Sequence, residues 1–507
     1  MRKAFIFIVL VLFSLTASAE GLREEFLANK SVIYAINIRS FNSKDTDKSG
    51  IIEMEKGETA GNFINAIERL DEIKSQGINT IHLLPVTKVG KKSALGTSGS
   101  LYSMASFTEL DRLIDDKTND FTVKEEAKFF VEECHRRGIK VLFDMPACGA
   151  YDLFLERPEL FALDKDKNPI TPLDWSDVRL FKVLDAQGNL YQPIYEAYKS
   201  YVDLLLELGA DGIRADVATN KPYEFWCELI QYTRSKRPDF MFLAEASEAW
   251  KTPIAKQAVF TSYDKILQAG FDGYLGSFFN FKNFKVFDLN TYMSETLKNL
   301  KKYRVQKTLI GGFSTHDEKS PVAIAGEAFA RQVLWLNVTL PLNPYFVDGF
   351  DTNDRYIYKY FNRKAADSFT DCEKYFVHQG QMDIFNLAAK PGGGNQNFAK
   401  EFKDALSFRA KYIDIIAKGE FIPLEVNNKA IFAYARKNKT GAILVVVSKD
   451  PLNIQKVNID AKKLRKFQNI QPVTKDFTPE MTKEGLIELK MSPYDIKVFV
   501  FSEELGN

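Results

Sequence analysis

The chain has 507 residues, which is enough to bury a large core and too many for one compact unit. Its 45% hydrophobic and 27% charged residues are typical of a soluble globular protein. The 68 basic and 67 acidic side chains are interspersed and leave a net charge of +1, which argues against a nucleic-acid-binding or polybasic membrane-binding protein.

The N-terminus is typical of a secretory signal. A basic pair precedes the apolar run 4–15, and residues 17–19 have the A-x-A cleavage pattern. We therefore expect a signal peptide at 1–19, a mature start near Glu20, and a secreted or periplasmic protein. An uncleaved N-terminal anchor is the alternative. No later segment is long and apolar enough to cross a bilayer, so we expect no membrane insertion after cleavage.

Apolar strand-like runs then alternate with helix-like segments. The expected strands are 31–38, 80–86, 140–144, 212–217, 239–245, 273–278, 307–313 and 340–347, and the clearest helices are 60–76, 124–137, 194–208 and 223–236. Eight strands with intervening helices predict an α/β fold, a (β/α)8 TIM barrel. Residues 147–190 break the rhythm and are expected to form an excursion after the third strand.

The pattern changes near the C-terminal end. After a PGGG break at 391–394 and a helix at 397–418, short alternating strands are expected at 430–436, 442–448, 454–459 and 496–501. We therefore predict a catalytic barrel domain over 20–418, excursion included, and an antiparallel β domain over 419–507.

The four cysteines, Cys134, Cys148, Cys227 and Cys372, match no zinc or CxxC spacing. Cys134 and Cys227 fall in expected barrel helices, so we predict that these two are buried free thiols.

Four motifs place an acid, or an acid beside Arg or His, at the end of an apolar run. They are VLFDMP (Asp144), DGIRADV (Arg214, Asp216), MFLAEAS (Glu245) and LIGGFSTHDE (His316, Asp317). The carboxyl ends of parallel barrel strands meet at one face, so these side chains are expected in one pocket. Three carboxylates delivered there suit glycoside cleavage by a nucleophile, an acid/base and a charge-stabilising group.

These motifs resemble the α-amylase family, glycoside hydrolase family 13, and in particular its bacterial amylase-like members. VIYAINIRSF and INTIHLLPV resemble the family's first two strands, and GADGIRADVA is the most specific match. The resemblance covers nearly all of the mature chain. It implies a retaining mechanism with Asp216 as nucleophile, Glu245 as acid/base and Asp317 as the stabilising acid.

The resemblance also implies substrate-binding residues. Arg214 would keep Asp216 ionised, Asp144 would support Arg214, and His316 would bind sugar hydroxyls. GSLYSMASF resembles the segment that carries a sugar-stacking tyrosine, here Tyr102; ordinary surface packing is the alternative for that ring.

The chain departs from the family pattern at two places. Cys148 and Gly149 stand where the first motif normally ends in Asn-His, so a usual calcium ligand and a sugar contact are missing. Asn220 stands where the second motif usually ends in His. We therefore expect no cation between the barrel and the excursion.

A different calcium loop is possible after the first strand. Oxygen ligands alternate there around Gly50, from the side chains of Asp45, Asp47, Ser49 and Glu53 and the carbonyl of Ile51. Lys56 stands where an EF-hand needs Glu, so a true EF-hand is excluded, and a solvated acidic turn is the alternative. The expected ion is structural Ca²⁺, and the chemistry itself requires no cofactor.

The sequence thus predicts an exported, retaining α-glucan hydrolase of the α-amylase type, a glycosidase that cleaves starch, glycogen or maltodextrins as a monomer. An α-glucan is the expected partner, with no nucleic acid. A glucanotransferase or maltosyltransferase of the same fold and a catalytically weak glucan-binding protein are the alternatives. Export favours hydrolysis, because polymeric food is met outside the cell.

Overall fold

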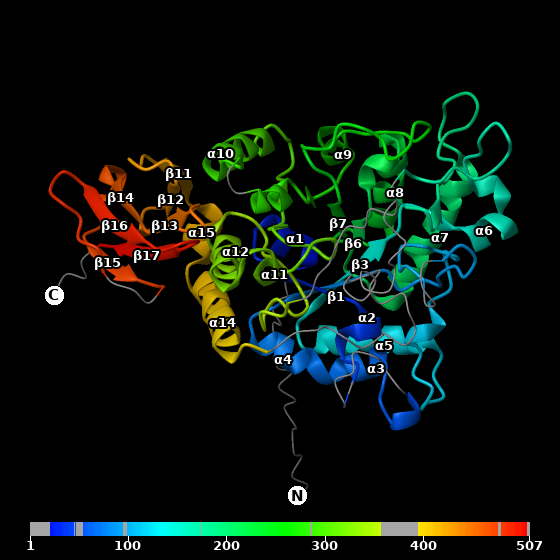
Figure 1. The fold of residues 1–507 in the computed structure, drawn as a ribbon. Coiled ribbons are helices and arrows are strands. Elements are labelled where there is room, and N and C mark those ends of the chain that lie inside the picture. Colours follow the sequence, from blue (N-terminus) through cyan, green and yellow to red (C-terminus); the bar gives the residue numbers. More distant parts are fainter. Residues whose placement is uncertain are drawn as a thin grey trace, which may run out of the picture.

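The computed structural model describes residues 21–44, 46, 54–94, 99–173, 175–283, 286–355, 394–474 and 478–503. A parallel sheet ringed by helices forms the main body, and a separate antiparallel β part carries the C-terminus (Figure 1). The predicted signal peptide, the predicted calcium loop residues and Cys372 lie outside the described residues.

The central sheet is an eight-stranded barrel with the strand order β10-β1-β2-β3-β6-β7-β8-β9 and parallel pairing throughout. Its strands are β1 (Ile33–Ile36), β2 (Thr80–Leu83), β3 (Lys140–Met145), β6 (Gly212–Ala215), β7 (Met241–Ala244), β8 (Gly273–Tyr274), β9 (Thr308–Leu309) and β10 (Tyr345–Val347). A parallel bridge between Ile310 and Asn343 joins the last strand to the first in this order. The predicted (β/α)8 barrel is confirmed.

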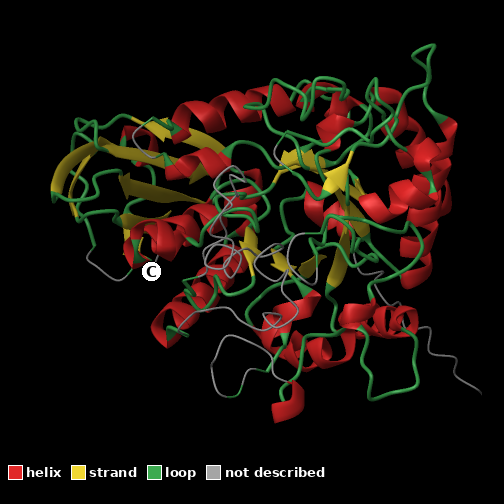
Figure 2. Cartoon of the chain, turned by 45° about the vertical axis from the view of Figure 1, so that its right-hand side comes forward, coloured by secondary structure: helices red, strands yellow, loops and turns green. Residues whose placement is uncertain are grey.

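Helices surround the sheet in both views (Figures 1 and 2). They are α1 (Leu22–Leu27), α2 (Ile38–Phe41), α3 (Phe63–Ala66), α4 (Leu70–Ser75), α5 (Val123–Arg136), α7 (Gln192–Leu208), α8 (Tyr223–Lys236), α9 (Tyr263–Gln268), α10 (Leu289–Leu300), α11 (Pro321–Ala325), α12 (Glu327–Thr339), α14 (Gln396–Lys411) and α15 (Ile413–Lys418). The helix expected at 60–76 is divided by the 3-10 turn η2 (Ile67–Arg69), although its buried residues keep the helical spacing.

Successive side chains of each strand alternate between the barrel interior and the helix layer. Leu142 and Leu243 pack inside, whereas Phe143 and Phe242 pack against the helices. Residues that are paired across neighbouring strands point to the same side of the sheet. His82 lies opposite Leu142, and Asp144 lies opposite Arg214. The polar residues at the carboxyl ends of the strands therefore point into the interior.

Helix α1 closes the amino-terminal end of the barrel. Phe26 is fully buried among the interior side chains, and its carbonyl accepts a 2.9 Å hydrogen bond from Asn343. A Cβ at Gly273 would lie 2.7 Å from the Phe26 ring, so only glycine allows this close approach. The open end is therefore the carboxyl end, where the motif residues gather.

The excursion after β3 contains a small antiparallel pair of strands, β4 (Gly149–Ala150) and β5 (Val178–Arg179). The helix α6 (Tyr151–Glu156) and the 3-10 turn η4 (Pro158–Leu160) lie between these two strands in the sequence. Leu173 N donates to Ile254 O at 3.1 Å, which ties this excursion to the loop after β7.

The C-terminal part is antiparallel, as predicted. One sheet has the order β11-β12-β13-β17-β15 and a second pairs β14 with β16. The strands are β11 (Glu420–Leu424), β12 (Ile431–Lys437), β13 (Gly441–Ser448), β14 (Gln455–Asp460), β15 (Asn469–Pro472), β16 (Leu486–Met491) and β17 (Ile496–Ser502). Buried hydrogen bonds from Gln332 to Ser448 O (2.7 Å) and between Thr339 and Tyr434 (2.7 Å) anchor this part to α12.

Within the described ranges, no helix is both long and apolar enough to cross a membrane. Cys134 is a buried free thiol as predicted, while Cys227 is free but only partly buried. The expectation of full burial for Cys227 is wrong, because it lies at the margin of the buried face of α8.

Candidate active site

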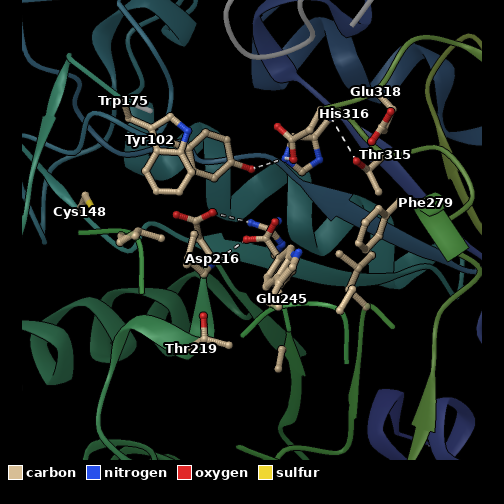
Figure 3. Close-up of a pocket in the computed structure, with 18 of the residues that line it drawn as sticks. Tyr102, Cys148, Trp175, Asp216, Thr219, Glu245, Phe279, Thr315, His316 and Glu318 are labelled. Atoms are coloured by element: carbon tan, nitrogen blue, oxygen red, sulfur yellow. Dashed lines mark hydrogen bonds and ion pairs between the residues drawn. The ribbon is translucent and has the colours of Figure 1, made fainter. Parts of the chain in front are cut away.

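A cavity of about 590 Å³ opens at the carboxyl ends of the barrel strands (Figure 3). Of the residues predicted to form the site, Tyr102, Arg214, Asp216, Glu245, His316 and Asp317 line this cavity. Asp144 lies beneath them, with 1% of its surface exposed. The structure therefore brings all seven predicted residues together.

Arg214 is the centre of the site. Its Nη1 donates to Asp144 and to Oδ1 of Asp216, each at 3.0 Å, and its Nη2 lies 3.0 Å from Oε1 of Glu245. Burial disfavours the guanidinium charge, yet the charges of Asp144 and Glu245 raise the pKa of Arg214 well above its usual value. One cation thus holds three carboxylates.

Asp216 follows β6 at the cavity floor. Its Oδ2 accepts a 2.9 Å hydrogen bond from Ala147 N, and its own N–H donates to Met145 O at 3.1 Å. Burial and the charge of Glu245 raise the pKa of Asp216 well above its usual range, and Arg214 opposes this shift.

Glu245 follows β7. Its Oε2 accepts a 2.7 Å hydrogen bond from Val217 N. Burial raises the pKa of Glu245; Arg214 lowers it, and the charge of Asp317 raises it further. Asp216 and Glu245 are close and charge-coupled, so they titrate as a pair.

A chain of hydrogen bonds supports Asp144 from its other side. The hydroxyl of Tyr102 lies 2.8 Å from Oδ2 of Asp144 and 2.7 Å from Nε2 of His316, with the two rings stacked 5.7 Å apart. His82 Nε2 lies 3.2 Å from the same Asp144 oxygen, and His82 Nδ1 lies 3.0 Å from the hydroxyl of Tyr345.

These contacts assign the protons. Tyr102 donates to Asp144 and accepts from the Nε2–H of His316, while Tyr345 donates to Nδ1 of His82. Burial lowers the pKa of His82, which keeps the ring neutral with its proton on Nε2. His82 and Tyr345 were not predicted as site residues. Both occupy positions of β2 and β10 whose side chains point into the barrel interior, and this alternation is the signal that could have identified them.

Apolar side chains form the walls of the cavity. Trp175 from the excursion and Phe279 from the segment after β8 lie on opposite sides of it (Figure 3). Leu173, Trp250 and Ile254 also line it. Aromatic faces beside acids suit sugar rings, whose C–H faces are apolar. Sequence reasoning missed these residues, of which Phe279 lies in the 3-10 helix η6 (Phe278–Lys282) and the others lie in loops.

The departures from the family pattern have a packing reason at Gly149. A Cβ there would lie 2.7 Å from the Phe181 ring and 2.8 Å from the Phe161 ring, so no side chain fits. Cys148 lines the cavity, and burial raises the pKa of its thiol to about 12, which favours the neutral thiol over the nucleophilic thiolate.

The five predicted calcium ligands lie outside the described residues, so the ion stays a prediction. In the same loop, Glu58 accepts hydrogen bonds from Thr46 N (2.7 Å) and Thr46 Oγ1 (3.0 Å). Elsewhere in the part of the chain that the structure describes, no group of three or more His, Cys, Asp or Glu could hold a metal ion.

The chain matches no protein-family model. It is 22% identical over 454 residues to a cyclomaltodextrinase of Thermoanaerobacter pseudethanolicus, which covers 82% of this chain and 70% of that protein. It is 25% identical over 316 residues to an α-1,4-glucan:maltose-1-phosphate maltosyltransferase of Cereibacter sphaeroides, covering 58% of this chain and 49% of that protein. The chain thus spans only about half of the second relative.

Among solved structures, a maltogenic α-amylase from Thermotoga neapolitana has a TM-score of 0.68 at 20% identity, covering 94% of this chain and 99% of that one. The resemblance to the α-amylase family predicted from the motifs is confirmed, since the sequence relatives include amylase-type glycoside hydrolases and a maltosyltransferase and the amylases among the solved structures share the fold.

Proposed function

We propose that this chain is an exported, retaining α-glucan hydrolase of the α-amylase type. The observation that carries the proposal is the single guanidinium of Arg214, which binds Asp216 and Glu245 at 3.0 Å each and so holds the two carboxyls close together. Close carboxyls suit a covalent glycosyl-enzyme, whereas inverting enzymes leave room for a water between them. The relatives and the apolar walls of the cavity support a glucan as the substrate.

In the first step, an ionised Asp216 oxygen attacks the anomeric carbon. The bond from that carbon to the glycosidic oxygen breaks, and Glu245 gives its proton to the leaving oxygen. In the second step, Glu245 takes a proton from water, the water oxygen attacks the same carbon, and the bond to Asp216 breaks. Configuration is retained because each step inverts it.

Asp317 and its neighbours act on charge and position. The carboxylate of Asp317 faces the cavity, where positive charge develops on the sugar ring in both transition states. His316 Nε2 lies 3.5 Å from Asp317 Oδ2 and 2.7 Å from the Tyr102 hydroxyl. The pair of rings can thus orient Asp317 and bind sugar hydroxyls.

The test is incubation of the purified protein with maltoheptaose, with products resolved by size and their anomeric form followed by NMR. Shorter products that appear first as the α-anomer support the proposal. Products that appear first as the β-anomer would contradict the retaining mechanism.

A transferase of the same fold is the second candidate. Its support is the apolar wall of Leu173, Trp250 and Ile254 beside the acids, which suits a second sugar as acceptor, and the relative named a maltosyltransferase. Products longer than maltoheptaose would favour it. Unchanged maltoheptaose would leave the glucan-binding alternative.

Export and oligomeric state are part of the proposal. Cleavage after Ala19, secretion or periplasmic location, and a monomeric mature chain are expected. N-terminal sequencing of the exported protein and its mass in solution by light scattering test these points.

A further inference from the structure

The two carboxyls that share the chemistry have nearly matched surroundings. Asp216 and Glu245 each receive one nitrogen of Arg214 at 3.0 Å. Each also receives one backbone N–H, from Ala147 at 2.9 Å and from Val217 at 2.7 Å. Arg214 and the backbone therefore do not decide which carboxyl keeps the proton that the pair shares, although the proposed mechanism needs it on Glu245.

A buried lysine breaks this symmetry on the Asp216 side. Lys221 is only 1% exposed, and its Nζ donates a 2.8 Å hydrogen bond to Ala147 O. The N–H of the same Ala147 points to Oδ2 of Asp216. The ammonium group and the carboxylate thus flank one residue, and their charges interact.

The surrounding contacts hold this lysine in place. Thr261 Oγ1 donates to Lys221 O at 2.7 Å, and the Lys221 ammonium lies 5.3 Å from the centre of the Tyr198 ring. The Tyr198 hydroxyl donates to Pro146 O at 2.8 Å, in the same peptide unit whose N–H binds Asp216. The segment that presents the Ala147 amide is therefore fixed from two sides.

Few other ionisable groups face this position. They are Asp216 at the end of β6, the Cys148 thiol after β3, the Tyr198 phenol on α7, and Asp177 of the excursion beyond the thiol. None of these four groups carries a positive charge.

The Glu245 side carries the opposite charge. Asp317 faces Glu245 across the cavity, and its negative charge raises the pKa of Glu245, after burial and against Arg214. The cation Lys221 beside Asp216 and the anion Asp317 beside Glu245 both favour the shared proton on Glu245, whereas the charge of Asp144 raises the pKa of both carboxyls.

We propose that Lys221 is a positioning residue that keeps Asp216 ionised and so places the shared proton on Glu245. The proposal rests on the proposed function, because that mechanism needs Asp216 ionised to attack and Glu245 protonated to act as the acid. Lys221 acts through its charge and through the Ala147 peptide, and does not touch the substrate.

The charge is present under physiological conditions. Burial lowers the pKa of Lys221 to about 8, while the thiol of Cys148 and the carboxylate of Asp216 counteract this. The ammonium form therefore predominates at neutral pH and is lost above about pH 8.

The test compares three variants by kcat/KM on maltoheptaose as a function of pH. Lys221→Met removes the charge and the hydrogen bond. Lys221→Gln removes the charge but can still donate to Ala147 O. Lys256→Met, in the exposed part of the loop after β7, removes one surface charge as a matched control.

Loss of a nearby positive charge raises a carboxyl pKa, so the acid limb of the profile should move up by about one pH unit in both Lys221 variants. It should stay in place in Lys256→Met. A purely structural lysine would lower activity without moving this limb. If Lys221→Gln is active and the acid limb of its pH profile lies at the same pH as in wild type, the proposal is overturned.

A second measurement does not depend on turnover. A buried lysine with a lowered pKa makes the folded state bind fewer protons than the unfolded state, so stability rises with pH between about 8 and 10.4. The melting temperature of wild type relative to Lys221→Met should rise over this range. A flat difference would show that Lys221 carries no buried charge, and would overturn the proposal even if Lys221→Gln fails to fold. Absence of all glucan turnover in wild type, with the melting difference intact, would instead reject the proposed function.

Discussion

The backbone N–H of Val217 donates a 2.7 Å hydrogen bond to Oε2 of Glu245. Val217 directly follows Asp216 and has a φ of 36°, a left-handed conformation that costs a β-branched residue about 1–3 kcal/mol. The turn that ends β6 therefore places the proposed nucleophile and also orients the proposed acid.

Glu245→Gln should be nearly inactive on glucans yet keep partial activity on substrates with good leaving groups. Such leaving groups need little protonation, so the first step proceeds without the acid. Comparing kcat on maltoheptaose with kcat on an activated aryl maltoside measures the difference. Equal losses on both substrates would show that Glu245 is not the acid.

Asp216→Asn should lose catalysis and gain stability at neutral pH. In the folded state, burial raises the pKa of Asp216 by more than Arg214 lowers it. The wild-type protein therefore loses stability as the pH rises above the pKa of the unfolded state, which is near 4. A neutral Asn avoids this loss, so the variant should be more stable than wild type at pH 7.

Denaturant melts at pH 4 and pH 7 measure this effect, with Asp120→Asn at an exposed site as the control. The gain should shrink toward pH 4, where Asp216 begins to take up its proton in the unfolded state as well. A variant that is less stable than wild type at pH 7 would show that the Arg214 ion pair outweighs burial.

Tyr345→Phe should destabilise the protein by about 1–3 kcal/mol, because it removes the donor to Nδ1 of buried His82 and leaves that nitrogen unsatisfied. A freer His82 should also loosen Asp144 and lower kcat modestly. Tyr232→Phe, which loses exposed hydrogen bonds to Asp203 and Lys236, is the matched control and should change stability little. Equal effects of the two substitutions would remove His82 from the support of the site.

The calcium prediction concerns the loop after β1. If this loop binds Ca²⁺, a hundredfold excess over the dissociation constant should stabilise the fold by about 2.7 kcal/mol and leave the chemistry nearly unchanged. Thermal melts with chelator and with added calcium, on wild type and on the double variant Asp45→Ala/Asp47→Ala, test it. A calcium shift that survives the double variant would place the ion elsewhere, and no shift in wild type would mean an acidic turn.

The barrel and the acids could be predicted because strand ends have a strong local pattern. Arg214 and Asp216 lie two residues apart after an apolar run, which puts both on the interior face. The expected strands at 273–278 and 307–313 are longer than β8 and β9, since apolar packing continues past the hydrogen-bonded ladder. The expected C-terminal strands did not include β11, β15 or β16, although the alternation of apolar and charged residues in β16 is visible in the sequence.

Long-range contacts explain what the sequence could not predict. His82 and Tyr345 lie within apolar runs, and their partnership joins β2 to β10 across 263 positions. The bond from Leu173 to Ile254 depends on how two loops fold over the cavity. The role of Lys221 could not be predicted from the sequence, because its effect on Asp216 passes through Ala147 in the segment after β3.

The central claim is that Asp216 forms a covalent bond to the sugar. The most direct measurement uses Glu245→Gln with α-maltosyl fluoride, whose leaving group needs no acid, followed by rapid acid quenching and mass spectrometry of proteolytic peptides. We predict a maltosyl adduct on the peptide that contains Asp216, absent from the same experiment with Asp216→Asn. Full turnover of the fluoride with no adduct, or an adduct on another carboxylate, would contradict the account.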